Sequence, residues 1–155
     1  MRFYKVILIV LAGVAMLAAC AGEPPPSTPL RTLDAYANAF KKKDITAMKL
    51  LLSDASIKMA EQQAREQGVI LDDIIKNETL FTADQKIAGY RNQKIEGEHA
   101  TIEVKNSYNS WDTVAFVLED GIWKIDKQAM ANQMMQQNEI DNKRMDDIIN
   151  QGRVP

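Results

Sequence analysis

The feature that most constrains this chain is a change of hydrophobic period near residue 86. Upstream, apolar residues between Leu33 and Phe40 recur at the i, i+3, i+4, i+7 spacing that gives a helix one apolar face. Downstream, apolar and polar residues alternate over 99–108 and 111–119, which is typical of half-buried strands. Helices followed by strands predict an α+β domain.

Three helices are expected before the strands, and each begins at a residue suited to capping it. Thr28 and Pro29 start the first, and Asp44 caps the second. Asp54 is expected to cap a third, which runs to about Gln67 and is closed by Gly68. The sequence LDDIIK adds a further helical turn or two.

The second half of the domain is predicted to be an antiparallel meander. Turn signals in the sequences EGE, NS and EDG separate its segments, and Asp-Gly is the strongest hairpin signal among them. About four strands are expected, over residues 86–96, 99–108, 111–119 and 122–126. The helices should pack on one face of this curved sheet, and the tail should form a C-terminal helix.

Residues 1–19 have the layout of a secretory signal: the basic stretch MRFYK, the apolar stretch VILIVLAGVAM and small residues before Cys20. The apolar run from Val6 to Ala19 covers 14 residues. A helix needs about 17 to 25 to cross a bilayer core. A permanent transmembrane anchor is therefore the weaker interpretation.

Cys20 is the only cysteine, so it has no partner for an internal disulfide. Leu17-Ala18-Ala19-Cys20 resembles the bacterial lipobox, which implies that the Cys20 thiol receives a diacylglyceryl group carrying palmitate-type chains and that the chain is cleaved between Ala19 and Cys20. Two or more acyl chains anchor a protein stably. Residue 21 is alanine rather than the aspartate that retains lipoproteins in the inner membrane. The expected location is the cell envelope, at the outer membrane facing the periplasm in a Gram-negative organism.

The chain divides into four segments. Three consecutive prolines follow Cys20 and favour an extended, semi-rigid spacer. The expected segments are a signal peptide (1–19), a lipidated cysteine with a Pro-rich linker (20–28), the α+β domain (29–126) and a helical extension (127–155).

Two stretches, TPLRTLDAYANAFKKKDITAMKLLLS and later VAFVLEDGIWKID, resemble small lipoprotein domains of the nuclear transport factor 2-like, cystatin-like superfamily. The resemblance covers about residues 28–126 and implies a cone-shaped fold with a cavity between the first helix and the concave sheet. The superfamily includes isomerases and dehydratases as well as non-enzymatic binding modules.

No residue pattern identifies a catalytic, cofactor or metal site, so none is predicted. The sequence has no Gly-rich phosphate loop, no Ser-His-Asp set and no metal-ligand spacing. His99, the only histidine, falls beside a turn, and Glu103 should point to water. Asp112, next to Trp111, is the carboxylate that best suits a general base in a cavity.

Six aromatic residues at core-like periodicity are candidates for a pocket lining, with burial in the core as the alternative interpretation. They are Tyr36, Phe40, Tyr90, Tyr108, Phe116 and Trp123.

The tail from Lys127 to Asn150 is predicted to be helical, with an interrupted apolar stripe. It holds four of the chain's eight methionines. Methionine is an adaptable filler at protein interfaces, and its thioether can also bind copper(I). We favour a helix that packs partly on the domain and partly on a partner.

The predicted function is a membrane-anchored binding or protein-interaction module, without catalysis, that takes a small apolar ligand or a protein partner. The alternative is an isomerase or dehydratase that uses the cone cavity. Without residues 1–19 the chain has 17 basic and 21 acidic residues, which gives no electrostatic footprint for nucleic acid.

The lipobox interpretation predicts that Cys20→Ser abolishes acylation and leaves the precursor uncleaved, because the modified thiol is what the peptidase recognises in this class. Metabolic labelling with a radioactive fatty acid and the apparent mass of the protein in membrane fractions measure this. A variant that matures and remains membrane-bound as the wild type does would contradict the interpretation.

Overall fold

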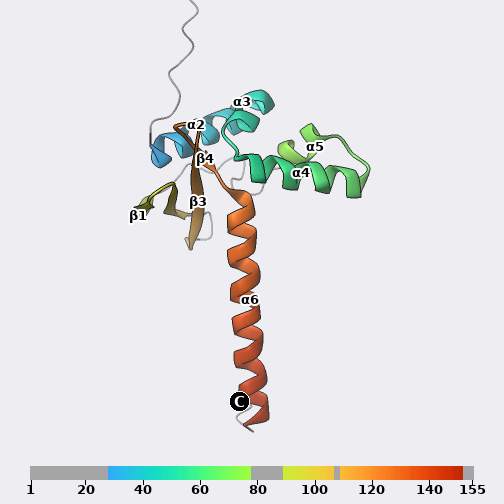
Figure 1. The fold of residues 1–155 in the computed structure, drawn as a ribbon, viewed down its shortest axis with the longest axis vertical. Helices are drawn as coiled ribbons and strands as arrows, with labels where there is room; N and C mark the ends of the chain where they lie inside the picture. The colour runs from blue at the N-terminus through green and yellow to red at the C-terminus, as the bar shows by residue number, and fades with distance from the viewer. Residues whose placement is uncertain (1–27, 78–88, 107–108, 152–155) are drawn as a thin grey trace, which may run out of the picture.

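The computed structural model describes residues 28–77, 89–106 and 109–151. Within these residues four helices precede the sheet: α2 (Pro29–Lys42), α3 (Ile45–Leu50), α4 (Asp54–Gln67) and α5 (Leu71–Lys76). Four strands follow, β1 (Tyr90–Glu96), β2 (His99–Lys105), β3 (Trp111–Glu119) and β4 (Ile122–Ile125), and the chain continues as α6 (Lys127–Asn150). The sheet is an antiparallel meander in the order β1-β2-β3-β4. The predicted α+β class is confirmed (Figure 1).

Side-chain caps set the starts of α2, α3, α4 and α6, and two of these caps are as predicted. The Thr28 hydroxyl accepts a hydrogen bond from the Arg31 N–H at 3.2 Å, and the Asp44 carboxylate accepts one from the Ala47 N–H at 3.0 Å. The predicted cap of the third helix was wrong by one residue. Ser53, which is extended with φ −65° and ψ 157°, caps α4, and Asp54 is its first helical residue.

The strand ends differ from the predicted ones by a few residues. β2 ends at Lys105, because Asn106 leaves the ladder and its N–H donates to the carbonyl of Ser110 at 2.8 Å. β4 ends at Ile125, because the Asp126 carboxylate accepts the Ala129 N–H at 3.0 Å and so caps α6. Residues 86–88 of the first predicted strand lie outside the described residues.

The core lies between α2 and one face of the sheet. Along β2 the alternate residues Ala100, Ile102 and Val104 are buried, and their neighbours on the other face are more exposed. The hydroxyl of buried Thr32 donates to the carbonyl of Trp123 at 2.8 Å, which fixes α2 against β4. This bond satisfies two buried polar groups, as a core of this kind requires.

A short extended segment after α3 continues the sheet beyond β4. Leu52 forms a parallel bridge with Ile125. The Ser53 N–H donates to the Ile125 carbonyl, and the Ile125 N–H donates to the Leu51 carbonyl, both at 2.9 Å. The helical half of the chain is thereby hydrogen-bonded to the last strand.

Two buried serines, which we call the serine junction (Ser53 and Ser56), join α4, β4 and α6. Their Oγ atoms are 2.7 Å apart, and the Ser56 hydroxyl donates to the Ile125 carbonyl at 3.1 Å. The Lys127 N–H, at the start of α6, donates to the Ser56 Oγ at 2.7 Å. A single hydroxyl therefore holds the point at which the chain leaves the sheet and becomes α6.

From this junction α6 projects away from the rest of the domain (Figure 1). Its first five residues are partly buried, and Met130 packs against the core. Beyond Ala131 its residues are exposed, apart from the partly buried Ile148. Among the helices that the structure describes, none combines the length and apolar character needed to span a bilayer.

Replacing Ser56 with alanine should lower the free energy of unfolding by about 1–3 kcal/mol, because the partly buried N–H of Lys127 loses its acceptor and the carbonyl of Ile125 loses one of its two donors. Ser110→Ala is the matched control, since Ser110 is exposed and surface changes of this kind stay within about 0.5 kcal/mol. Urea unfolding followed by circular dichroism measures both. Equal stability of the two variants would show that the serine junction contributes nothing.

Candidate functional site

The six aromatic residues predicted from the sequence do not share one place in the fold. Tyr36, Phe116 and Trp123 are buried in the core, and Phe40 packs against it. Tyr90 is 56% exposed on β1. Tyr108 lies outside the described residues.

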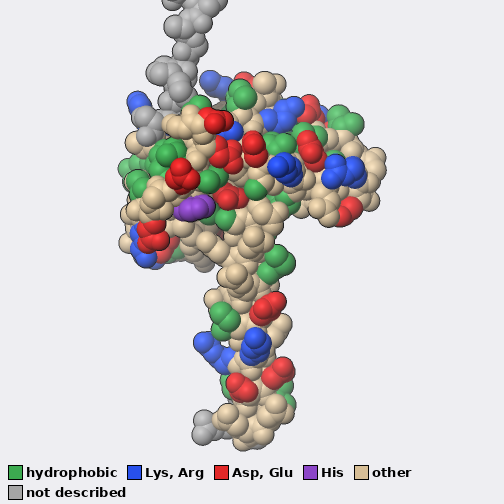
Figure 2. All heavy atoms as spheres, in the orientation of Figure 1, with side chains coloured by type: hydrophobic (Ala, Val, Ile, Leu, Met, Phe, Trp, Pro, Cys, Tyr) green, Lys and Arg blue, Asp and Glu red, His purple; other side chains and the backbone are tan. Residues whose placement is uncertain are grey.

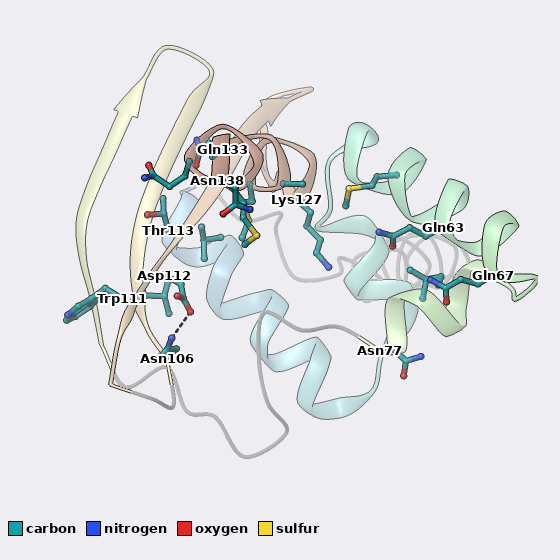
Figure 3. A pocket seen from close by; sticks show the side chains of 18 residues that line it. Gln63, Gln67, Asn77, Asn106, Trp111, Asp112, Thr113, Lys127, Gln133 and Asn138 are labelled. Carbon is teal, nitrogen blue, oxygen red and sulfur yellow. Dashed lines mark hydrogen bonds between the residues drawn. The ribbon is translucent and has the colours of Figure 1, made fainter. Parts of the chain in front are cut away.

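The described residues instead enclose a hollow between α4, α6 and the start of β3, with a volume of about 930 Å³ (Figure 3). We call it the α4–α6 hollow. Seven of its lining side chains are fully apolar or thioether groups: Met59, Ile74, Val104, Val114, Met130, Ala131 and Met134. Amides supply much of the remaining lining, among them Gln63, Gln67, Asn106, Gln133 and Asn138.

The helical periodicity of α4 and α6 places several of these side chains on the side of each helix that faces the hollow. Met59, Gln63 and Gln67 are four residues apart on α4 and therefore lie on one side of that helix. Met130 and Met134 have the same spacing on α6. The hollow exists because α6 leaves the sheet at the serine junction and passes alongside β3 instead of folding back over it.

Asp112 lies on the helix-facing side of the sheet. It pairs with Val104, and alternation places it on the same face as Val114 and Phe116. Its side chain is exposed at the hollow and accepts a hydrogen bond from the Asn106 amide at 2.9 Å (Figure 3). The carboxylate is thus held by an amide of the neighbouring turn and not, among the described contacts, by a tyrosine.

The lining combines apolar and amide groups with two charged side chains. Asp112 and Lys127 are its charged members, and the described lining contains no histidine, cysteine, serine or tyrosine. Apolar side chains beside amide groups can take an apolar surface and hydrogen-bond its polar edges. A nucleophile paired with a base is not assembled by these residues.

His99 is the first residue of β2, directly after the turn at Gly97, and it is exposed. This agrees with its predicted place beside a turn. Within residues 28–77, 89–106 and 109–151, no three or more His, Cys, Asp and Glu side chains come together in a way that could hold a metal ion.

The opposite face of the sheet carries an ordered charged cluster. Arg91 lies over the Trp111 ring at 4.1 Å and forms a 2.6 Å ion pair with Glu103. The hydrogen bonds from Arg91, and also from Asn92, lower the pKa of the Glu103 carboxyl below its usual value. Glu103 points away from the core, as predicted, and the guanidinium of Arg91 is engaged on two sides.

The outer part of α6 exposes large apolar side chains. Met134 is 68% exposed and Met145 is 59% exposed. Met135, Ile140 and Ile149 are also largely exposed. Figure 2 shows hydrophobic side chains spaced between charged ones along this projecting helix.

The sequence predicts that the tail methionines lie on a helix that packs partly on the domain and partly on a partner, but it does not predict the hollow. The sequence signal for the hollow is the four-residue spacing of Met59, Gln63 and Gln67. This signal is hard to recognise because two of the three side chains are polar amides, so the spacing does not form an apolar stripe. Comparisons with protein-family models, with curated proteins and with solved structures found no match to this chain.

Proposed function

We propose that the protein is a lipid-anchored envelope protein whose domain binds an apolar helical segment of a protein in the α4–α6 hollow, without catalysing a reaction. The observation that supports this most is the continuity of the hollow with the exposed apolar side chains of α6. Met134 belongs to both, because it lines the hollow and is 68% exposed.

The shape and chemistry of the hollow favour a helix over a small molecule. An amphipathic helix fits a groove by placing apolar side chains at i, i+3, i+4 and i+7. Two helices, α4 and α6, bound the hollow on different sides. The amides of Gln63, Gln133 and Asn138 can pair with polar groups at the margins of an inserted helix.

The filled core supports a binding module over an isomerase or dehydratase. An enzyme of that type needs a proton-transfer group in a water-poor cavity and a second group for the developing charge. Tyr36, Phe116 and Trp123 fill the space where α2 crosses the sheet. Asp112 is exposed, which favours a role at the margin of a binding surface.

The envelope location is proposed from the sequence. Cys20 completes a lipobox, and residues 20–28 supply a Pro-rich spacer that holds a domain away from a lipid surface. The resemblance to nuclear transport factor 2-like lipoprotein domains supports the same proposal. The lipobox and the three prolines lie within residues 1–27, outside the described part of the chain.

A photoreactive residue tests the binding proposal in cells. Introduced at Gln63, which lines the hollow, it should give at least fivefold more adducts with polypeptide than at Glu61. Glu61 is the matched control because it is exposed on the same helix, about 200° around its axis from Gln63. Adducts are identified by mass spectrometry of digested membranes from cells that express the full-length protein.

Adducts only with lipid, or equal yields of polypeptide adducts from the two positions, would contradict the proposal.

A further inference from the structure

Most of helix α6 is exposed to solvent. It contains 24 residues, which is about 36 Å of helix at 1.5 Å per residue. Its described contacts with α4, β3 and the core come from the end that begins at Lys127. In proteins most of the stability of a helix comes from packing of one of its faces, and the exposed outer part of α6 lacks such packing. The outer half of α6 therefore needs a partner.

The sequence of α6 contains a coiled-coil seam. One set of residues recurs at alternating spacings of three and four, which places it on a single side of the helix. The set is Ala131, Met134, Asn138, Asp141, Met145 and Ile148. Apolar residues occupy both ends of this seam and polar residues occupy its middle.

The seam is complementary to itself in the antiparallel direction. Two antiparallel copies of α6, centred between Asn138 and Asp141, place Met134 opposite Met145. In the same register the small Ala131 lies opposite the large Ile148 of the other copy. Each end of the seam thus pairs apolar residues, and small meets large as close packing requires.

The polar middle of the seam selects the antiparallel direction. In that register Asn138 of each copy lies opposite Asp141 of the other, so an amide can donate to a carboxylate. Within its own helix, Asp141 contacts Gln137 and Arg144 through Oδ1, which leaves Oδ2 for an amide of the second copy. A parallel pair would instead place two Asp141 carboxylates against each other, and like charges at a seam are destabilising.

The same seam leads into the hollow. Ala131, Met134 and Asn138 belong both to the seam and to the lining of the α4–α6 hollow. A helix that packs on them must therefore enter the hollow. In the antiparallel register that helix contributes Met145 and Ile148, and its carbonyl end lies beside Lys127, whose positive charge complements the helix dipole.

We propose that the segment bound in the α4–α6 hollow is the outer half of α6 from a second copy of this chain, so that two antiparallel α6 helices fill two hollows in one symmetric dimer. This inference rests on the proposed function and names its partner. In this dimer each α6 lines the hollow of its own copy and inserts into the hollow of the other copy, because a two-fold axis makes the two contacts identical.

Engineered cysteines in the full-length, membrane-bound protein test the direction and register. A variant that carries both Met134→Cys and Met145→Cys should form disulfide-linked dimers on mild oxidation, at least fivefold more than its control. The control carries Gln136→Cys and Lys143→Cys, which have the same symmetric placement but lie on the side of α6 away from the seam. Met134→Cys alone should not link, because antiparallel copies of residue 134 are separated by about 16 Å along the helix axis.

Equal linking by the seam variant and its control, or strong linking by Met134→Cys alone, would overturn the antiparallel pair. All replaced residues are exposed, so loss of folding is not expected to obscure the result.

The photoreactive residue at Gln63 separates this inference from the proposed function. In cells that express isotopically light and heavy copies together, its adducts should include mixed light–heavy pairs that join residue 63 to the tryptic segment 145–153. Adducts with a different protein, together with no linking of the seam variant, would overturn this inference and leave the proposed function standing. Absence of polypeptide adducts at residue 63 would contradict both.

Discussion

The hydrogen bond from the Lys127 N–H to the Ser56 Oγ, at 2.7 Å, is the constraint on which the functional part of this molecule depends. It fixes the place where α6 starts, against the first turn of α4 and the end of β4. Asp126 caps α6 at the same point. Because the departure of α6 is fixed there, the helix runs beside β3 and leaves the α4–α6 hollow between itself and α4.

The sheet side of the hollow forms where the buried apolar face of β3 ends. On the helix-facing side of β3, Phe116 and Val114 are buried, whereas Asp112 on the same face is exposed. The apolar face therefore ends within the strand. Beyond that point the sheet presents a carboxylate and an adjacent amide, Asn106, to a space bounded by α6. The apolar side chains exposed beside this space, on α6, are of the kind that marks interaction sites.

Local signals were enough to predict most of the fold. Thr28 and Asp44 cap helices, Gly68 ends one in the left-handed conformation, and the alternation in β2 matches its buried face. These features depend on residues a few positions apart. The serine junction could not be predicted in this way, because Ser53 and Ser56 have the spacing of an ordinary cap and Ser56 bonds to Lys127, 71 positions away. The aromatic residues illustrate the same limit, since periodicity indicates a buried face but not whether that face is filled or hollow.

The central claim is that the outer half of α6 is stabilised by a second copy. Amide hydrogen exchange of the detergent-solubilised, full-length protein at increasing dilution measures this directly. Protection of residues 139–150 should fall with dilution, as expected when a partner stabilises a segment by mass action, while protection of α2 and β3 should stay constant. Protection of residues 139–150 that does not change with concentration would contradict the claim.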